Sequence, residues 1–291
     1  MKSFFCSFFL LFIISNSSAQ YFDLGISLGG ANYLGDLTPG SFFVSLGETH
    51  VYAGIGARLN LTDRFSFRSS INYGEISADD NVANNLNEFR RSRNLQFRSS
   101  IKEIELSAQI NLLRYDPYML ESRFTPYVTI GIGIFSFNPR ALYQGEWYDL
   151  QPLGTEGQGL PGNEGKYPLT QLSIPIGGGL KFALTENLNL TVEYSMRKTF
   201  TDYLDDVSST YPELNELARE RGEIARKLSW RTDEIIPEAV PPSPGSGRGD
   251  PNDLDWYIFA GFSITYNFIR GGLYKSYKSK GKPYKGKCPE L

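Results

Sequence analysis

A period-two alternation of apolar with small or polar residues constrains this chain more than any other feature. In its last such segment, Ile258, Phe262 and Ile264 fall on one face, and Gly261 and Ser263 fall on the other. Successive side chains of a strand point to opposite sides, so the pattern predicts a sheet with one apolar and one mixed surface.

The same pattern recurs along the chain, and the segments are long. We predict strands near residues 21–33, 50–61, 64–76, 101–112, 125–136, 171–184, 187–199 and 255–268. Strands of about ten residues or more are long enough to cross a bilayer while tilted. Short and long junctions alternate between them, which is typical of outer-membrane proteins. We therefore expect an all-β protein, an eight-stranded antiparallel transmembrane β-barrel of the outer-membrane type with short periplasmic turns and long external loops.

The start of the chain has the pattern of an export signal. Lys2 precedes an apolar run over residues 4–14, and Ser17-Ser18-Ala19 supplies small residues before a cleavage site. The alternative, an amino-terminal membrane helix, is disfavoured because the apolar run is too short. We expect a cleaved signal peptide over residues 1–19, a barrel over 20–269 in the outer membrane, and both termini in the periplasm.

The two faces of the predicted strands differ in the way that a membrane barrel requires. Bulky apolar residues such as Leu24, Ile55 and Ile132 form the lipid-facing set, and glycines such as Gly29 and Gly179 lie on the other face. A soluble barrel such as a lipocalin is the alternative, with the apolar face inside. Strand length, the signal peptide and the many small residues suited to a narrow lumen favour the membrane version.

Charged residues also fall on the lumen face. Buried charges are costly unless they are paired, so we expect a salt-bridged plug and not an open pore. The predicted members are Arg58, Arg68, Glu103, Glu105, Lys181, Glu193 and Arg197.

The longest predicted loop, residues 200–254, should be partly helical and mobile. Leu214, Leu217, Ile224 and Leu228 have helical spacing, which indicates a short helix that caps the barrel mouth or docks a partner. Residues 241–247, rich in Pro, Gly and Ser, should be mobile. The Arg-Gly-Asp tripeptide at 248–250 is interpreted as a chance match to an integrin ligand.

Residues 270–291 form a basic tail. It carries seven Lys or Arg against one Glu, a net charge of +6, while the whole chain is −3. We expect a disordered periplasmic segment that contacts an acidic partner, or simply a solvated tail. Cys288 is available for an intermolecular disulfide. The other predicted contacts are Lys278, Lys280, Lys282, Lys285 and Lys287.

The sequence contains little that indicates catalysis. The single histidine, His50, is expected at the outer end of the second strand, where Glu48 or Asp36 could pair with it. No Gly-x-Ser-x-Gly elbow, metal-ligand cluster or phosphate-binding loop is present. We therefore expect no enzymatic activity, no cofactor and no nucleic-acid partner.

Two stretches carry a family resemblance. Residues 29–37 read Gly-Gly-Ala-Asn-Tyr-Leu-Gly-Asp-Leu, and residues 197–208 read Arg-Lys-Thr-Phe-Thr-Asp-Tyr-Leu-Asp-Asp-Val-Ser. The chain resembles the PorG-like outer-membrane proteins of the Bacteroidetes type IX secretion system, which in some members supports gliding motility. The motif residues are Asp36, Arg197, Asp202, Tyr203, Asp205, Asp206 and Tyr211.

The resemblance implies a non-enzymatic secretion component that contacts a periplasmic ring of PorK-like lipoprotein and PorN-like protein. Asp202, Asp205 and Asp206 could also bind calcium, although their spacing is not that of an EF-hand. The alternatives are a general envelope barrel similar to the OmpA membrane domain, and an outer-membrane enzyme centred on His50.

Overall fold

The structure is a computed structural model that describes residues 21–38, 46–81 and 88–268. The predicted signal peptide and basic tail lie outside these residues. The strands are β1 (Tyr21–Leu34), β2 (His50–Asn60), β3 (Phe65–Asp79), β4 (Gln96–Asn111), β5 (Phe124–Ser136), β6 (Pro139–Tyr143), β7 (Glu146–Asp149), β8 (Thr170–Ala183), β9 (Leu188–Thr199) and β10 (Trp256–Asn267).

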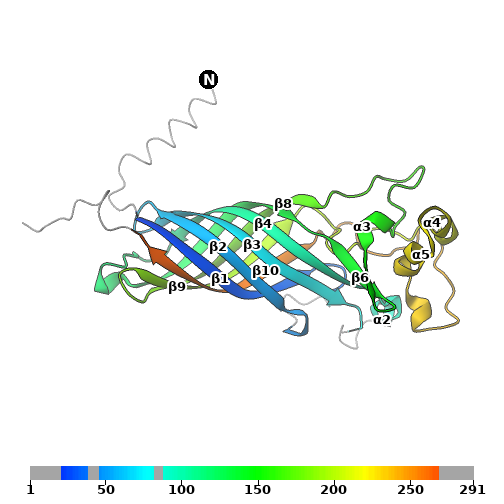
Figure 1. Cartoon of the computed structure of the whole chain (residues 1–291), viewed down its shortest axis with the longest axis horizontal. Helices are drawn as coiled ribbons and strands as arrows, with labels where there is room; N and C mark the ends of the chain where they lie inside the picture. The colour runs from blue at the N-terminus through cyan, green and yellow to red at the C-terminus, as the bar shows by residue number, and fades with distance from the viewer. Residues whose placement is uncertain (1–20, 39–45, 82–87, 269–291) are drawn as a thin grey trace, which may run out of the picture.

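Eight of these strands close into an antiparallel barrel, as the sequence predicts (Figure 1). Each barrel strand pairs with its neighbour along the chain, and β1 pairs with β10 to complete the ring, with Ile26 opposite Ile264. The chain enters β1 and leaves β10 at one end of the barrel, which we call the terminal end. The opposite end is the loop end.

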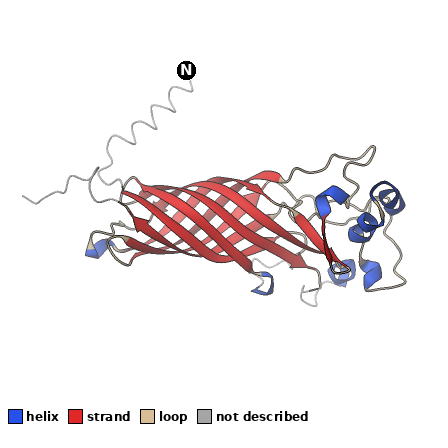
Figure 2. Ribbon diagram, viewed as in Figure 1, coloured by secondary structure: helices blue, strands red, loops and turns tan. Residues whose placement is uncertain are grey.

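The long connections gather at the loop end, where most helices lie (Figure 2). We name these connections L1 (residues 35–49), L2 (80–95), L3 (137–169) and L4 (200–255). They hold η1 (Leu46–Glu48), α2 (Glu88–Arg93), α3 (Leu150–Leu153), α4 (Leu214–Arg221), α5 (Glu223–Ser229) and η3 (Thr232–Glu234), while η2 (Leu120–Ser122) lies at the terminal end. Among the described residues, no helix is both long and apolar enough to cross a membrane.

The structure corrects the predicted strands in two places. β4 begins at Gln96, five residues before the predicted start, and it pairs with the end of β3 through Asp79 opposite Gln96. Within the predicted loop at residues 137–170, β6 and β7 form a hairpin that extends the sheet from β4. Both additions lie at the loop end, above the part of the wall where apolar residues alternate.

The outer wall is apolar and the lumen is filled. Ile132 is 66% exposed and Ile104 is 59% exposed, and the other predicted lipid-side residues on these strands face outward with them. An exposed apolar band around a closed sheet is stable only in hydrocarbon, so the fold is that of a membrane barrel. Glycine also allows neighbouring strands to approach closely: a Cβ added at Gly29 of β1 would lie 2.1 Å from the carbonyl oxygen of Ala260 on the paired strand β10.

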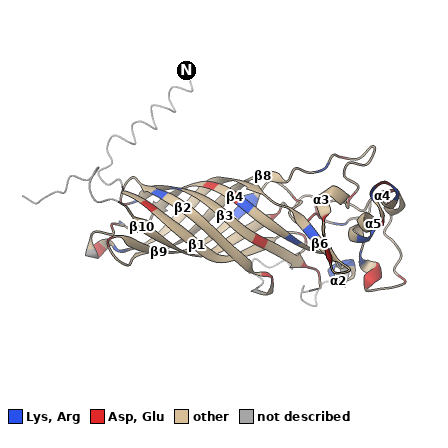
Figure 3. Ribbon diagram, viewed as in Figure 1, with Lys and Arg blue, Asp and Glu red and all other residues tan. Residues whose placement is uncertain are grey.

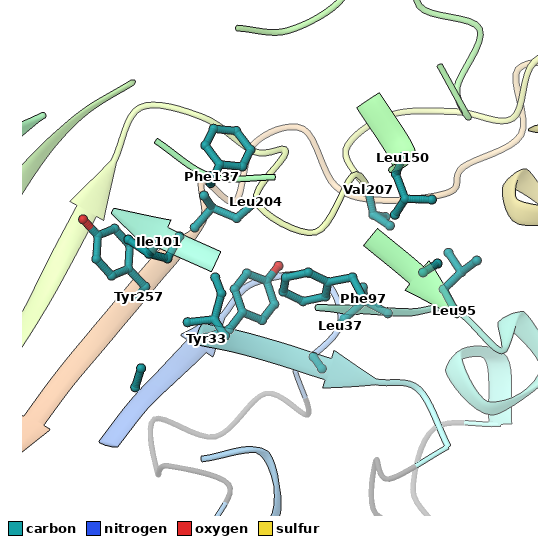
Figure 4. Close-up of a cluster of buried hydrophobic side chains, with 14 of the residues drawn as sticks. Tyr33, Leu37, Leu95, Phe97, Ile101, Phe137, Leu150, Leu204, Val207 and Tyr257 are labelled. Carbon is teal, nitrogen blue, oxygen red and sulfur yellow. The ribbon is translucent and has the colours of Figure 1, made fainter. Parts of the chain in front are cut away.

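The hydrophobic core lies at the loop end, where strand ends and loops meet (Figure 4). Tyr33 of β1, Phe97 of β4 and Tyr257 of β10 pack there with Leu204 and Val207 of L4, and all five are at most 3% exposed. L4 therefore belongs to the folded body of the protein. We call this packed assembly of L1 to L4 the loop cap.

Candidate functional site

The lumen holds a network of buried charges, built from side chains that alternate inward on β3, β4 and β9. Arg197 lies 3.0 Å from Glu105 and 3.5 Å from Glu103, and all three side chains are at most 1% exposed. Arg68 lies 2.8 Å from Glu105 and 2.6 Å from Glu193. The structure thus brings five of the predicted plug residues into one connected network. Figure 3 colours the Lys and Arg positions of the ribbon blue and the Asp and Glu positions red, and both colours occur on the barrel strands.

The other two predicted plug residues lie nearer the terminal end. Arg58 lies 3.8 Å from Asp23, a carboxylate that the sequence analysis missed. Lys181 was expected to pair with a carboxylate, but it donates to Asn111 (3.0 Å) and lies over the ring of Tyr127 (4.5 Å from its centroid). An amide oxygen and an aromatic face satisfy this ammonium group because both present negative charge density.

The network leaves little free space. Two cavities of about 20 Å³ each lie beside Arg68 and Tyr52, and each has room for about one water molecule. Beside the charged network, Tyr52 stacks on Phe259 at 4.3 Å, and the Arg197 guanidinium lies 4.4 Å from the centre of the Phe259 ring. Aromatic and charged side chains therefore fill this part of the lumen together.

The motif residues of L1 and L4 come together in the loop cap, separate from Arg197 in the lumen. The Tyr33 hydroxyl lies 2.8 Å from Asp205 Oδ2 and 2.6 Å from Asp255 Oδ1. A hydroxyl has one proton to donate, so two ionised carboxylates would leave one of these contacts without a hydrogen. The geometry favours a proton on one of these two carboxyl groups, which then donates to the Tyr33 oxygen while Tyr33 donates to the other carboxylate.

An arginine organises the other side of the loop cap. Arg248 is 3% exposed and lies 3.0 Å from Glu156, and it also donates to the carbonyl oxygen of Asp206. Glu156 in turn accepts from the backbone N–H groups of Ser208 (2.9 Å) and Ser209 (3.0 Å). The arginine of the Arg-Gly-Asp tripeptide is therefore an internal structural residue and is not exposed to a partner.

The remaining motif residues fix the path of L4. Tyr203 stacks on Tyr167 with ring centroids 4.5 Å apart, and the Tyr167 hydroxyl donates to Asp206 (2.6 Å). The N–H of Tyr211 donates to the carbonyl of Ser246 (2.9 Å), so Tyr211 joins the Pro-, Gly- and Ser-rich segment to the rest of L4. Asp36 of L1 accepts from the N–H of Asp250 (2.9 Å). Motif residues thus join L1, L3 and L4.

Burial changes the titration of the loop-cap carboxyl groups. Burial, reinforced by neighbouring carboxylates, raises the pKa of Asp202 and of Asp205 to about 8. Burial also raises the pKa of Asp206 to about 6, against the opposing charge of Arg248. Burial and the charge of Asp205 raise the pKa of Asp255 well above its ordinary value. A proton on Asp205 or Asp255 agrees with these directions.

The helical stripe of L4 packs inward. Leu217 is fully buried and Leu228 is 2% exposed, so α4 and α5 press this face against the protein's own L3. Of the two interpretations of the stripe, capping is the one that the structure adopts.

His50 has different partners from those expected. Its Nε2 lies 2.7 Å from Ser77 Oγ, and its Nδ1 lies 3.4 Å from Glu75. Glu48 meets the same Ser77 hydroxyl as an acceptor, and Asp36 lies in the loop cap with Asp250 instead. The cluster on β2 and β3 was not foreseen because Ser77 and Glu75 have no distinctive local motif.

The two remaining predicted features are the suggested calcium-binding aspartates of L4 and the basic tail. Within residues 21–38, 46–81 and 88–268, no group of three or more His, Cys, Asp or Glu side chains is arranged to hold a metal ion. Asp205 and Asp206 instead accept protein hydrogen bonds. Cys288 and the tail lysines Lys278, Lys280, Lys282, Lys285 and Lys287 lie outside the described residues.

Solved structures with similar folds are outer-membrane barrels. OprG from Pseudomonas aeruginosa is 10% identical with a TM-score of 0.40, over 88% of this chain and 100% of that chain. Neisserial surface protein A is 10% identical with a TM-score of 0.39, over 85% and 97%. The attachment invasion locus protein Ail of Yersinia pestis is 9% identical with a TM-score of 0.39, over 86% and 99%.

The sequence comparison is more specific about family than about function. No curated protein matches the chain. A family model described as a domain of unknown function, DUF6089, matches residues 2–224, a region that includes β1 to β9 and the motif residues of L1 and L4. The chain belongs to the DUF6089 family.

Proposed function

We propose that this protein is an outer-membrane component of a type IX protein secretion system, in which the barrel is a closed anchor for the periplasmic ring complex. The observation that carries the proposal is the coupling of a filled lumen to a loop cap built from the family motif. Arg197 seals the barrel, while Asp36, Asp205 and Asp206 order the cap. A barrel of this kind holds a position in the membrane and does not conduct cargo.

The arrangement of the chain ends supports a periplasmic contact. β1 begins and β10 ends at the same end of the barrel, so a tail after residue 268 starts beside the first strand. We place this terminal end in the periplasm, because short turns face that compartment in outer-membrane barrels. The basic tail, with a net charge of +6, then meets the ring proteins, and Cys288 is available to form a disulfide with one of them.

Affinity purification from cells tests the tail directly. The full chain should recover PorK-like and PorN-like ring proteins, and deletion of residues 270–291 should abolish that recovery. The matched control keeps the length and replaces Lys278, Lys280, Lys282, Lys285 and Lys287 by Gln, which should lower recovery strongly if charge is the attraction. Equal recovery by all three proteins would remove the tail from the mechanism.

A general envelope barrel similar to the OmpA membrane domain is the second candidate, and the filled lumen favours it equally. Gene deletion separates the two. Loss of secreted cargo with an intact envelope supports the secretion role, whereas normal secretion with a leaky envelope supports the general role.

For Cys288, non-reducing gels of the wild type and of Cys288→Ser show whether a disulfide-linked species exists.

A further inference from the structure

A polar cluster lies at the rim of the barrel, outside both the lumen network and the loop cap. His50 Nε2 is 2.7 Å from Ser77 Oγ, and His50 Nδ1 is 3.4 Å from Glu75 Oε1. The register of β2 with β3 ends at Tyr52 opposite Gly74, so His50 lies beside the part of β3 that extends past β2.

This cluster has the order of contacts found in serine hydrolases. One ring nitrogen of the histidine meets the serine hydroxyl and the other meets a carboxylate, which orients the ring and stabilises the imidazolium ion. The 3.4 Å contact with Glu75 is longer than an ideal hydrogen bond, as such contacts often are without substrate. Because these sites are recognised by geometry, the absence of a Gly-x-Ser-x-Gly motif does not exclude one.

The position of the cluster indicates its substrate. Glu75 and Ser77 alternate on the same face of β3 as Ile71 and Tyr73, which are 57% and 50% exposed. The Glu75 side chain is 32% exposed, and Ser77 lies deeper, at 7%. Ser77 lies six residues beyond Ile71, about 20 Å along the strand, at the loop-side border of the apolar band. The acyl ester bonds of membrane lipids lie at such a border, between hydrocarbon and headgroup. We propose that Ser77, His50 and Glu75 form a hydrolytic site for acyl esters of membrane lipids.

The reaction is an acyl transfer to serine and then to water. Ser77 Oγ attacks the ester carbonyl carbon while its proton passes to His50 Nε2. The bond from that carbon to the alcohol oxygen breaks, and the alcohol leaves with the proton from His50. Water then attacks the acyl-serine and gives a proton to His50. The carboxylic acid is released, and Ser77 regains its proton.

Two charged neighbours border the site. Arg98 lies opposite Ser77 in the register of β3 with β4, and its Nε lies 3.5 Å from Glu75 Oε1, the same oxygen that His50 contacts, so it helps to hold Glu75 beside the histidine. The Ser77 hydroxyl donates to Glu48 in this structure. Reaction therefore begins when this proton turns toward His50.

Covalent labelling tests the nucleophile. The full chain, folded in detergent micelles, is treated with a fluorophosphonate probe, and intact mass shows one adduct per chain on Ser77. Ser77→Ala should abolish the adduct, and His50→Ala should slow labelling at least about a hundredfold. Ser69→Ala is the matched control, because Ser69 is exposed on the same face of β3, and it should label like the wild type. Heat-dependent gel mobility verifies that each variant is folded.

Vesicle hydrolysis tests the substrate. Diacyl phospholipid vesicles that contain the wild type should release fatty acid, and vesicles that contain Ser77→Ala should not. An unlabelled wild type, or equal labelling of Ser77→Ala, overturns the site. Hydrolysis of a water-soluble short-chain ester without release of fatty acid from vesicles overturns the lipid substrate. Neither outcome depends on recovery of ring proteins, so this inference stands or falls separately from the secretory role.

Discussion

At the scale of single residues, the most consequential side chain is Arg197. It compensates two carboxylates, Glu103 and Glu105, that are fully buried. Removing one member of a buried ion network leaves an uncompensated charge in a medium of low dielectric constant, and that costs more than the pair contributes.

We expect Arg197→Met to lower the free energy of unfolding by about 3–5 kcal/mol. The measurement is urea unfolding in detergent or bilayers, followed by tryptophan fluorescence. The control variant Arg140→Ala removes the ion pair of Arg140 with Asp149, whose side chains are about half exposed. It should lower the free energy of unfolding by at most about 1 kcal/mol. Equal losses for the two variants would contradict the buried network.

The residue scale also shows where sequence reasoning reached its limit. The lumen position of Arg197 follows from period two alone, because every second residue of a strand faces inward. The contact of Tyr33 with Asp255 joins residues 222 apart in the sequence, and Glu156 and Arg248 are 92 apart. No local pattern encodes such pairs, because they depend on how four loops fold over one another.

At the scale of elements, the strands were predictable where one face meets lipid. The start of β4 was missed because Gln96, Arg98 and Ser100 on its outward face are polar, so the apolar alternation is absent there. The β6–β7 hairpin was missed for the same reason. It lies beyond the apolar band, where an outward side chain such as Arg140 does not meet lipid and so need not be apolar. Periodicity therefore identified the membrane wall and not its extension.

The loop cap should loosen as the pH rises. The pKa values of Asp202 and Asp205 are raised to about 8 and that of Asp206 to about 6, while an unfolded Asp has about 3.9. Because these pKa values are higher in the folded protein than in the unfolded chain, the protonated carboxyl groups stabilise the loop cap. This stabilisation is complete below about pH 4 and is lost as the pH rises through 6 and 8.

Hydrogen exchange checks this expectation. Protection factors for residues 200–255 should fall at least about tenfold between pH 5 and pH 9, since one unit of pKa corresponds to a tenfold change in the opening equilibrium. Factors for β5, in the barrel wall, should change far less. Asp255→Asn keeps an acceptor for Tyr33 but cannot titrate, so it should flatten the profile. An unchanged profile in L4 would show that these carboxyl groups do not control the cap.

At the scale of the whole molecule, the barrel is a filled cylinder with an ordered cap on one end. The charged network and the aromatic side chains Tyr52, Phe259 and Tyr257 contact one another in the lumen, between the terminal end and the loop cap. This arrangement explains how a chain with a barrel fold serves as an anchor, since the path that a solute would take is occupied by side chains.

Single-channel recording tests that closure. The wild type in planar bilayers should show no steady conductance, because charged and aromatic side chains fill the lumen and the two cavities beside Arg68 and Tyr52 hold about one water molecule each. A general diffusion porin measured in the same bilayers is the positive control. Stable, ohmic openings in the wild type would mean that the charged network is not a plug.

The fold and the proposed function both require that the apolar face of the sheet meets hydrocarbon and the charged face meets the lumen. Spin labels at two exposed apolar positions measure this orientation: Ile132 in the apolar band, 66% exposed, and Val240 in L4, 86% exposed. Both are placed in a chain whose cysteines Cys6 and Cys288 are replaced by serine, reconstituted in lipid vesicles. We expect the label at 132 to be relaxed by oxygen and shielded from a water-soluble nickel complex, and the label at 240 to show the reverse. Strong relaxation of the label at 132 by the nickel complex would contradict this orientation.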